Sequence, residues 1–177
     1  ADNVWIKILQ RVILGLGGAA ALKELGYHID KFHLNEGHAV FAFVEQARGL
    51  PAADIEKLKS RFVYTCHTPV VAGHDRFSIN DLSGVLKKED FDIVERFGKE
   101  SRDVINLTLL SMNIASSTNA VSKNHQKVMH LQFPEYKERI KYVTNGVHPY
   151  TWISARIMEL FEKYPSVFQD VRSNPMV

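Results

Sequence analysis

Three short polar segments carry side chains whose types suit the binding of a hydroxyl-rich ligand. They are Asn35-Glu36-Gly37-His38, His67-Thr68-Pro69 and Asn145-Gly146-Val147-His148. Neutral imidazoles and amides each donate and accept hydrogen bonds, and a carboxylate such as that of Glu36 accepts from hydroxyls or holds a neighbouring histidine. A glycine such as Gly146 lets a ligand approach the backbone closely. These residue types predict a polar binding site if the fold brings the segments together.

The elements that must position these segments are strands and helices in alternation. Runs of β-branched and aromatic residues predict strands over residues 27–34, 61–66, 114–121 and 139–144. Apolar spacing predicts helices over 6–16, 19–25, 37–48, 90–97, 103–112, 124–131 and 151–164, with a loop over 69–79. This alternation indicates an α/β fold with a parallel sheet and flanking helices. Ligands bind beyond the carboxyl ends of such strands, so the polar segments should share one edge.

Each segment taken singly also has a purely structural interpretation. A histidine after a strand often caps a turn, and Asn145-Gly146 is a common turn dipeptide. The coincidence of three such segments at the ends of strands favours a binding site.

Composition limits the classes of function. Lys and Arg number 22 and Asp and Glu 20, a net charge of +2, which argues against nucleic acid as a partner. The single cysteine, Cys66, allows no internal disulfide and fits a reducing compartment. Residues 1–10 do not resemble a signal peptide, and the apolar run at 39–44 is too short to cross a membrane. We therefore expect a cytoplasmic, soluble protein with neither membrane nor nucleic acid as a partner.

Four longer stretches resemble the α-glucan phosphorylase family. They are HLNEGHAVFAFVE from His33, CHTPVVAGHDRF from Cys66, NLTLLSMNIASSTNAVSKNH from Asn106 and YVTNGVHPYTWI from Tyr142. The second stretch is similar to the shorter, bacterial and archaeal branch of the family. Order and rough spacing also agree, from about Gln10 to Ile153.

This resemblance implies part of a GT-B glycosyltransferase fold, with Rossmann-like halves around a cleft. Residues 1–143 would be the later part of the N-terminal Rossmann-like domain, and residues 144–177 the crossover into a C-terminal domain. The implied activity, in glycogen or other glucan metabolism, transfers glucosyl units from an α-1,4-glucan to phosphate and yields glucose 1-phosphate. Pyridoxal phosphate is the implied cofactor, glucan and phosphate are the implied partners, and a homodimer is the implied assembly.

The resemblance also implies roles for individual residues. His67 would act at the catalytic centre and bind the glucosyl unit, and Asn145 would bind the same sugar from the other side, with Gly146 leaving room for it. Glu36 and His38 would support the site near the anomeric carbon. Asp75, within the second matching stretch, joins them as a substrate-binding candidate.

Parts of the family pattern are missing from these 177 residues. The stretch with the cofactor lysine (an Asn-Met-Lys run), the basic residues that hold substrate phosphate and the Gly-Asn-Gly-Gly-Leu-Gly loop do not occur. We therefore expect a middle segment of the family's chain that neither binds the cofactor covalently nor catalyses phosphorolysis alone.

The leading alternative is a dinucleotide-binding Rossmann enzyme that uses NAD(P). Gly15-Leu16-Gly17-Gly18-Ala19-Ala20 fits the G-x-G-x-x-A pattern, and Glu36 follows about 20 residues later. Against it, the upstream apolar residues have helical spacing, and Lys7 and Arg11 would interrupt a buried strand. The structural interpretation is a turn between two helices.

Three further alternatives have weaker support. A metal hydrolase would draw on the histidines, but the spacing of His33, Glu36 and His38 matches no helical zinc motif. A nucleophilic hydrolase would use Cys66 beside His67, which point to opposite faces of a strand. A carbohydrate-binding module without catalysis would keep the same cleft residues, and the sequence alone leaves it open.

Overall fold

The computed structural model describes residues 3–166. The chain divides into two compact units, residues 1–144 and 145–177. The identification of these parts with an N-terminal domain and a crossover stays a prediction.

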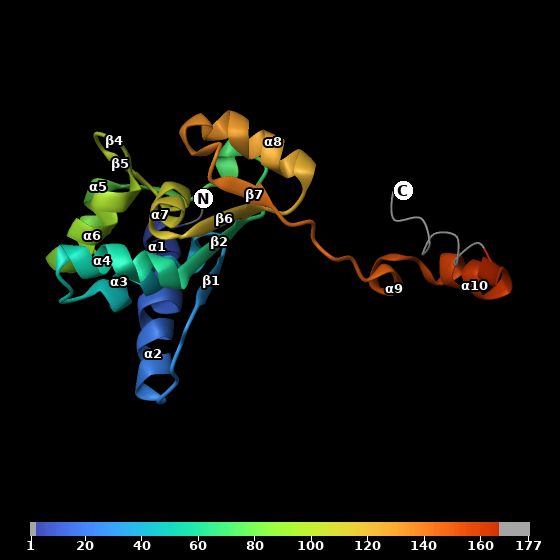
Figure 1. Cartoon of the computed structure of the whole chain (residues 1–177), viewed down its shortest axis with the longest axis horizontal. Helices are drawn as coiled ribbons and strands as arrows, with labels where there is room; N and C mark the ends of the chain where they lie inside the picture. Colours follow the sequence, from blue (N-terminus) through green and yellow to red (C-terminus); the bar gives the residue numbers. More distant parts are fainter. Residues whose placement is uncertain (1–2, 167–177) are drawn as a thin grey trace. The chain divides into compact units, whose positions relative to one another are not determined.

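The first unit contains a four-stranded parallel sheet with the order β1-β2-β6-β7 (Figure 1). Its strands are β1 (Phe32–Asn35), β2 (Phe62–Cys66), β6 (Ser117–Ala120) and β7 (Ile140–Tyr142). In register, Asn35 lies beside Thr65, and Thr65 lies beside Asn119. The predicted parallel α/β fold is confirmed, although β1 starts five residues later than the predicted strand.

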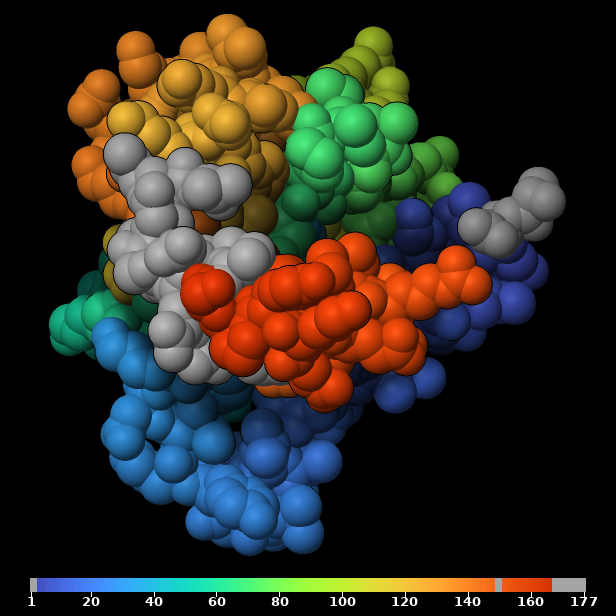
Figure 2. Space-filling model, turned by 90° about the vertical axis from the view of Figure 1, so that its right-hand side faces the viewer, coloured from blue at the N-terminus to red at the C-terminus, as the bar shows by residue number. Residues whose placement is uncertain are grey.

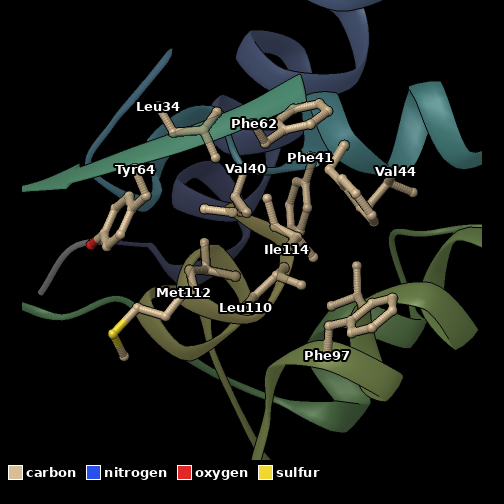
Figure 3. Close-up of a cluster of buried hydrophobic side chains, with 14 of the residues drawn as sticks. Leu34, Val40, Phe41, Val44, Phe62, Tyr64, Phe97, Leu110, Met112 and Ile114 are labelled. Carbon is tan, nitrogen blue, oxygen red and sulfur yellow. The ribbon is translucent and has the colours of Figure 1, made fainter. Parts of the chain in front are cut away.

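Helices on one side of this sheet bury its apolar residues. They include α3 (Phe41–Ala47) and α7 (Leu107–Ile114). Figure 3 shows Leu34, Phe62 and Tyr64 of the strands facing the side chains of α3 and α7. The rings of Phe62 and Phe43 meet edge to face at 5.2 Å between centroids. The alternate residues of the strands, such as Thr65 and Asn119, point to the other face.

Every crossover in the sheet moves one place in the same direction. Right-handed connections that all move in one direction place their helices on the same face of the sheet. The opposite face is therefore not covered by these connecting helices. That opposite face carries mainly polar residues, among which His33, Ser117 and Lys141 are exposed. Thr65 hydrogen-bonds both neighbours there, His33 at 2.7 Å and Asn119 at 2.9 Å. Apolar burial in this unit is therefore concentrated on one side of the sheet.

The chain begins with a continuous helix rather than with two helices joined by a turn. It comprises α1 (Val4–Val12), a π-helical segment (Ile13–Gly17) and α2 (Gly18–Glu24). The helix ends at Glu24, and Gly26, with a φ of +79°, gives the left-handed stop that the sequence predicts. Gly15 lies against α3, where a β-carbon would come within 2.8 Å of the Phe41 Cβ. The prediction of a turn at these glycines is therefore wrong, because Gly15 lies within the helix and allows it to pack closely against α3.

Length and composition alone would let this helix span a membrane. It has 21 residues, and its most apolar window has a mean hydropathy of 1.4. Only 22% of that window is buried: Ile8, Leu16 and Ala19 pack against the unit, whereas Ile6, Ile13 and Leu14 are exposed. Lys7 and Arg11 on the same helix form ion pairs within the unit. The expected cytoplasmic location stays a prediction.

A second sheet of three antiparallel strands was not predicted. Its strands are β3 (Arg76–Ser78), β4 (Lys99–Ser101) and β5 (Val104–Asn106), in the order β3-β5-β4. β3 lies in the predicted loop over 69–79, and β4 lies between two predicted helices. β5 occupies the start of the helix predicted over 103–112, and that helix begins only at Leu107. Three-residue strands are too short to show an alternating pattern, which explains the omission.

The remaining elements connect these layers. In the first unit they are α4 (Ala52–Leu58), α5 (Ile79–Ser83), α6 (Lys88–Gly98) and α8 (Lys123–Gln132), with short 3-10 turns at Gly37–Ala39, Lys59–Arg61, Val71–Gly73 and Pro134–Tyr136. The second unit contains α9 (Pro149–Trp152) and α10 (Ala155–Lys163). The single final helix predicted over 151–164 is therefore wrong in its continuity, because Ser154 caps the start of a separate helix, α10.

Candidate functional site

Two of the three polar segments meet at the carboxyl ends of β1 and β2. The Glu36 Oε1 atom accepts hydrogen bonds from the backbone N–H of His67 and, at 3.0 Å, from the Thr68 hydroxyl. The N–H of Glu36 in turn donates to the Thr65 carbonyl at 3.0 Å. The segments that follow neighbouring strands are thus joined through one carboxylate, at the edge where the sequence predicts a site.

Glu36 holds this position in an unusual backbone conformation. Its φ of 63° and ψ of 179° lie in a region that glycine occupies almost alone. The next residue, Gly37, is buried against Leu107, where a β-carbon would lie 3.1 Å from the Leu107 Cβ. This close approach fixes the path of the chain after β1, and the strained Glu36 aims its carboxylate at the end of β2.

The imidazoles of His67 and His38 are exposed at this edge. Within residues 3–166, the His67 ring has no hydrogen-bond partner, whereas its backbone N–H is bound by Glu36. A ring on a fixed backbone with both nitrogens open to solvent can donate to one hydroxyl and accept from another. His38 lies in the 3-10 turn Gly37–Ala39, directly after Glu36.

Sequence reasoning missed three residues that hold the segment after β2. His125 and Gln132 of α8 donate hydrogen bonds to the carbonyls of Thr68 and Pro69, and His74 contacts Gln132. His74 and His125 are both buried. A buried histidine must satisfy its ring nitrogens inside the protein, but no spacing pattern in the sequence marks a histidine as buried.

Asp75 is buried and paired with the first helix. Its carboxylate oxygens lie 2.7 Å from the Lys7 Nζ atom and 2.8 Å from the Arg11 Nε atom. Burial opposes ionisation of Asp75, but the hydrogen bonds and charges of Lys7 and Arg11 outweigh it and lower the pKa of the carboxyl. The carboxylate therefore ties the first helix to the segment before β3. A substrate-binding role for Asp75 stays a prediction.

The third polar segment belongs to the second unit. Asn145, Gly146 and His148 are exposed, and the His148 Nδ1 atom lies 2.8 Å from the Thr151 hydroxyl. Asn145 and His67 belong to different units, and their contact with one ligand stays a prediction.

The chemistry required by two alternative enzymes does not fit this geometry. Cys66 is fully buried, and burial, with the nearby charge of Glu36, raises the pKa of its thiol to about 11. A nucleophilic cysteine needs a lowered pKa and access to substrate, so Cys66 is a core residue. Among residues 3–166, no group of three or more His, Cys, Asp or Glu side chains is placed to hold a metal ion.

The dinucleotide-binding alternative is also wrong. It requires a strand that ends at the first glycine, followed by a tight turn whose N–H groups face a pyrophosphate. In the structure, residues 4–24 form a helix, so the backbone N–H groups of Gly17 and Gly18 lie within the helix. Gly15 packs against Phe41 and Ala42, which leaves no space for a ligand at that point.

Several curated relatives of this sequence are named as phosphorylases. It is 36% identical to maltodextrin phosphorylase of Thermococcus litoralis over an alignment that covers 89% of this chain and 21% of that protein. Glycogen phosphorylase of Aquifex aeolicus is 31% identical over 90% of this chain and 26% of its own length. Glycogen phosphorylase of Mycobacterium tuberculosis is 30% identical over 87% of this chain and 22% of its own. No family model matches the sequence.

A solved structure supports the fold. The catalytic domain of starch synthase IV from Arabidopsis thaliana, bound to ADP and acarbose, has a TM-score of 0.53 and 16% identity over 77% of this chain. The match covers 29% of that chain, and at this identity it shows the fold alone, that of a GT-B glycosyltransferase.

The chain thus spans about a fifth to a quarter of the length of these curated relatives. By its similarity over nine-tenths of its own length, it is related to the α-glucan phosphorylases and corresponds to one part of them.

Proposed function

We propose that this chain supplies one wall of the glucosyl site in a glycosyltransferase that phosphorolyses α-1,4-glucan to glucose 1-phosphate. The observation that carries the proposal is the bond between Glu36 and the backbone of His67, which fixes an exposed imidazole at the carboxyl edge of a parallel sheet. The relatives named as phosphorylases supply the reaction class.

His67 would contact the sugar directly in this proposal. Its ring is free to form hydrogen bonds with two hydroxyls. Its backbone carbonyl belongs to the same residue whose N–H donates to Glu36, so the position of that carbonyl is also fixed. Glu36 would orient His67 and would leave its other carboxylate oxygen beside the bound sugar. Asn145 and Gly146 of the second unit would reach the same glucosyl unit when the two units are placed around it.

The residues of this chain do not fit covalent attachment of pyridoxal phosphate. A lysine that forms a Schiff base needs a desolvated amine with a lowered pKa. No lysine among residues 3–166 is buried, and Lys7, one of the less exposed, is paired with Asp75. The cofactor would be held by parts of a longer polypeptide, and the chain alone would recognise a sugar without transferring it.

An activity assay on two polypeptides tests the proposal. We expect no glucose 1-phosphate when the 177-residue chain is incubated with maltodextrin and phosphate, and formation of it by a polypeptide that includes the flanking coding sequence. In the longer polypeptide, His67→Ala should reduce kcat/KM by a factor of about 100, because a buried sugar hydroxyl would lose its partner.

His28→Ala is the matched control, because His28 is exposed and lies outside the site. Two results would contradict the proposal: glucose 1-phosphate formation by the 177-residue chain alone, or equal activity of the His67→Ala and His28→Ala variants.

A further inference from the structure

The segment after β2 is held from the side opposite Glu36 by helix α8. The His125 Nε2 atom donates to the Thr68 carbonyl at 3.0 Å. The Gln132 Nε2 atom donates to the Pro69 carbonyl at 2.9 Å. Figure 2 shows the green segment near residue 70 directly beside the golden and orange atoms of α8. Two successive carbonyls next to His67 are therefore bound by one helix.

His74 fixes the side chain of Gln132. Because the Gln132 amide nitrogen donates to Pro69, its Oε1 atom faces His74, and the His74 Nε2 atom donates to it at 2.8 Å. The other ring nitrogen, Nδ1, accepts from the Thr108 hydroxyl at 2.9 Å. A chain of hydrogen bonds thus runs from Thr108 on α7 through His74 and Gln132 to the segment beside His67.

The two histidines share one tautomer. Each ring carries its proton on Nε2, since a carbonyl or amide oxygen accepts from that atom. Each Nδ1 atom accepts instead, from Thr108 in His74 and, at 3.4 Å, from the backbone N–H of Val121 in His125. With exposed fractions of 5% and 7%, neither ring can exchange these partners for bulk water.

The loop itself is tightly folded between these anchors. A β-carbon at Gly73 would lie 2.6 Å from the Thr68 Cγ2 atom, so residues at the two ends of the loop are in contact. The N–H of Gly73 donates to the Val70 carbonyl at 3.0 Å. We therefore expect the loss of either anchor from α8 to affect the whole segment, including the backbone of His67.

We propose that His74 and His125 are positioning residues that fix the backbone of His67 to Pro69 from the α8 side, as Glu36 fixes it from the β1 side. They act through Gln132 and through the Thr68 carbonyl, and neither contacts the ligand. The consequence for sugar binding rests on the proposed function of His67, whereas the positioning itself does not.

Paired substitutions separate the two ring nitrogens of His125, and Gln132→Leu removes the anchor that His74 holds. Asn places its polar atoms near the position of Nδ1, and Gln places them near Nε2. His125→Asn should lose the bond to Thr68, and His125→Gln should keep it. We expect backbone amides of residues 67–74 to exchange hydrogen about fivefold faster or more in His125→Asn and in Gln132→Leu, since a hydrogen bond of about 1 kcal/mol is lost. His125→Gln should restore slow exchange.

His130→Asn is the matched control. His130 also lies on α8 and donates from Nε2 to a backbone carbonyl, that of Ile140 at 3.2 Å, on β7 rather than on this loop. It should leave exchange at residues 67–74 unchanged. In the unsubstituted chain, nitrogen NMR should find the proton of His74 and His125 on Nε2.

The proposal is overturned if the ring proton of His74 or His125 resides on Nδ1. It is also overturned if the amides of residues 67–74 exchange as fast in His125→Gln as in His125→Asn, or if His130→Asn accelerates their exchange equally. Exchange needs no substrate, so failure of the proposed function would show separately, as absence of glucose 1-phosphate from the longer polypeptide. In that polypeptide, His125→Asn should lower kcat/KM while His125→Gln largely retains it.

Discussion

The carboxylate of Glu36 binds the backbone N–H of His67, which joins the residues that follow β1 and β2. Glu36 reaches this position only with a φ of 63°, a conformation that costs a non-glycine residue about 1–3 kcal/mol. The two hydrogen bonds from His67 and Thr68 offset this cost, because bonds to a charged acceptor are stronger than average.

Two substitutions of Glu36 should separate the effect of its backbone strain on stability from the effect of its hydrogen bonds to His67 and Thr68. Glu36→Ala loses both bonds, keeps the strain and should lower the free energy of unfolding by about 2 kcal/mol. Glu36→Gly loses the same bonds but relieves the strain, so it should be more stable than Glu36→Ala. Urea denaturation measures both values. A glycine variant less stable than the alanine variant would contradict the conformational argument.

The free energy of unfolding should depend on pH through the ionisation of Asp75. Its carboxyl has a lowered pKa in the folded chain, where hydrogen bonds and charges from Lys7 and Arg11 outweigh the effect of burial. In the unfolded chain the pKa of the Asp75 carboxyl is about 3.9, and in the folded chain it is lower. The ionised carboxylate therefore stabilises the fold at pH values above about 3.9. This contribution to the free energy of unfolding disappears as the pH falls through the pKa of the folded chain.

Asp75→Asn should therefore be less stable than the unsubstituted chain at pH 7, by about 2 kcal/mol, and the difference should shrink below about pH 4. Thermal unfolding at a series of pH values measures this. Asp92→Asn is the control, since Asp92 forms an exposed pair with Lys88. A difference between Asp75→Asn and the unsubstituted chain that stays constant from pH 7 to pH 3 would disprove the linkage.

The thiol of Cys66 should be unreactive in the folded chain. Burial, and then the charge of Glu36, raises its pKa to about 11, so almost no thiolate exists at pH 8. A thiol reagent should label the native chain at least about 100-fold more slowly than the chain in urea. Ser117→Cys places a second thiol on the exposed sheet face, which should react at once. Rapid labelling of Cys66 in the native chain would show that β2 is not buried.

Gly15 and Gly17 should respond in opposite directions to alanine. At Gly15 a β-carbon would lie 2.8 Å from the Phe41 Cβ and 2.9 Å from the Ala42 nitrogen, so Gly15→Ala should cost about 2 kcal/mol. At Gly17 a β-carbon meets nothing within 4 Å, so Gly17→Ala should stabilise the helix by up to about 1 kcal/mol. Unfolding midpoints in urea compare them, and equal effects would refute the packing role of Gly15.

The sequence predicted the main sheet because its strands carry a local signal. The strand at Phe62–Cys66 lies within the predicted range of 61–66, since its aromatic and β-branched residues mark a buried strand. Helix α8 at Lys123–Gln132 is within one residue of its predicted bounds. The polar segments after β1 and β2 were also correctly expected to share an edge, because topology alone brings them together.

Other features could not be predicted because they depend on distant residues. The positive φ at Glu36 occurs next to Gly37, which packs on Leu107, 70 residues further along the chain. The buried state of His74 depends on Thr108 and Gln132, which lie on different helices. The G-x-G-x-x-A pattern at Gly15 looked like a phosphate-binding turn, and only its contact with Phe41 reveals it as a helix-packing surface.

The spatial order of the strands in the main sheet, β1-β2-β6-β7, is also their order along the chain. β2, β6 and β7 therefore each pair with a strand that was synthesised earlier, and no later strand has to be inserted between earlier ones. The same order holds for the hydrogen bond between Glu36 and His67, because Glu36 is synthesised 31 residues before His67, the residue whose N–H donates to it. Synthesis from the N-terminus thus assembles the predicted site wall in one direction.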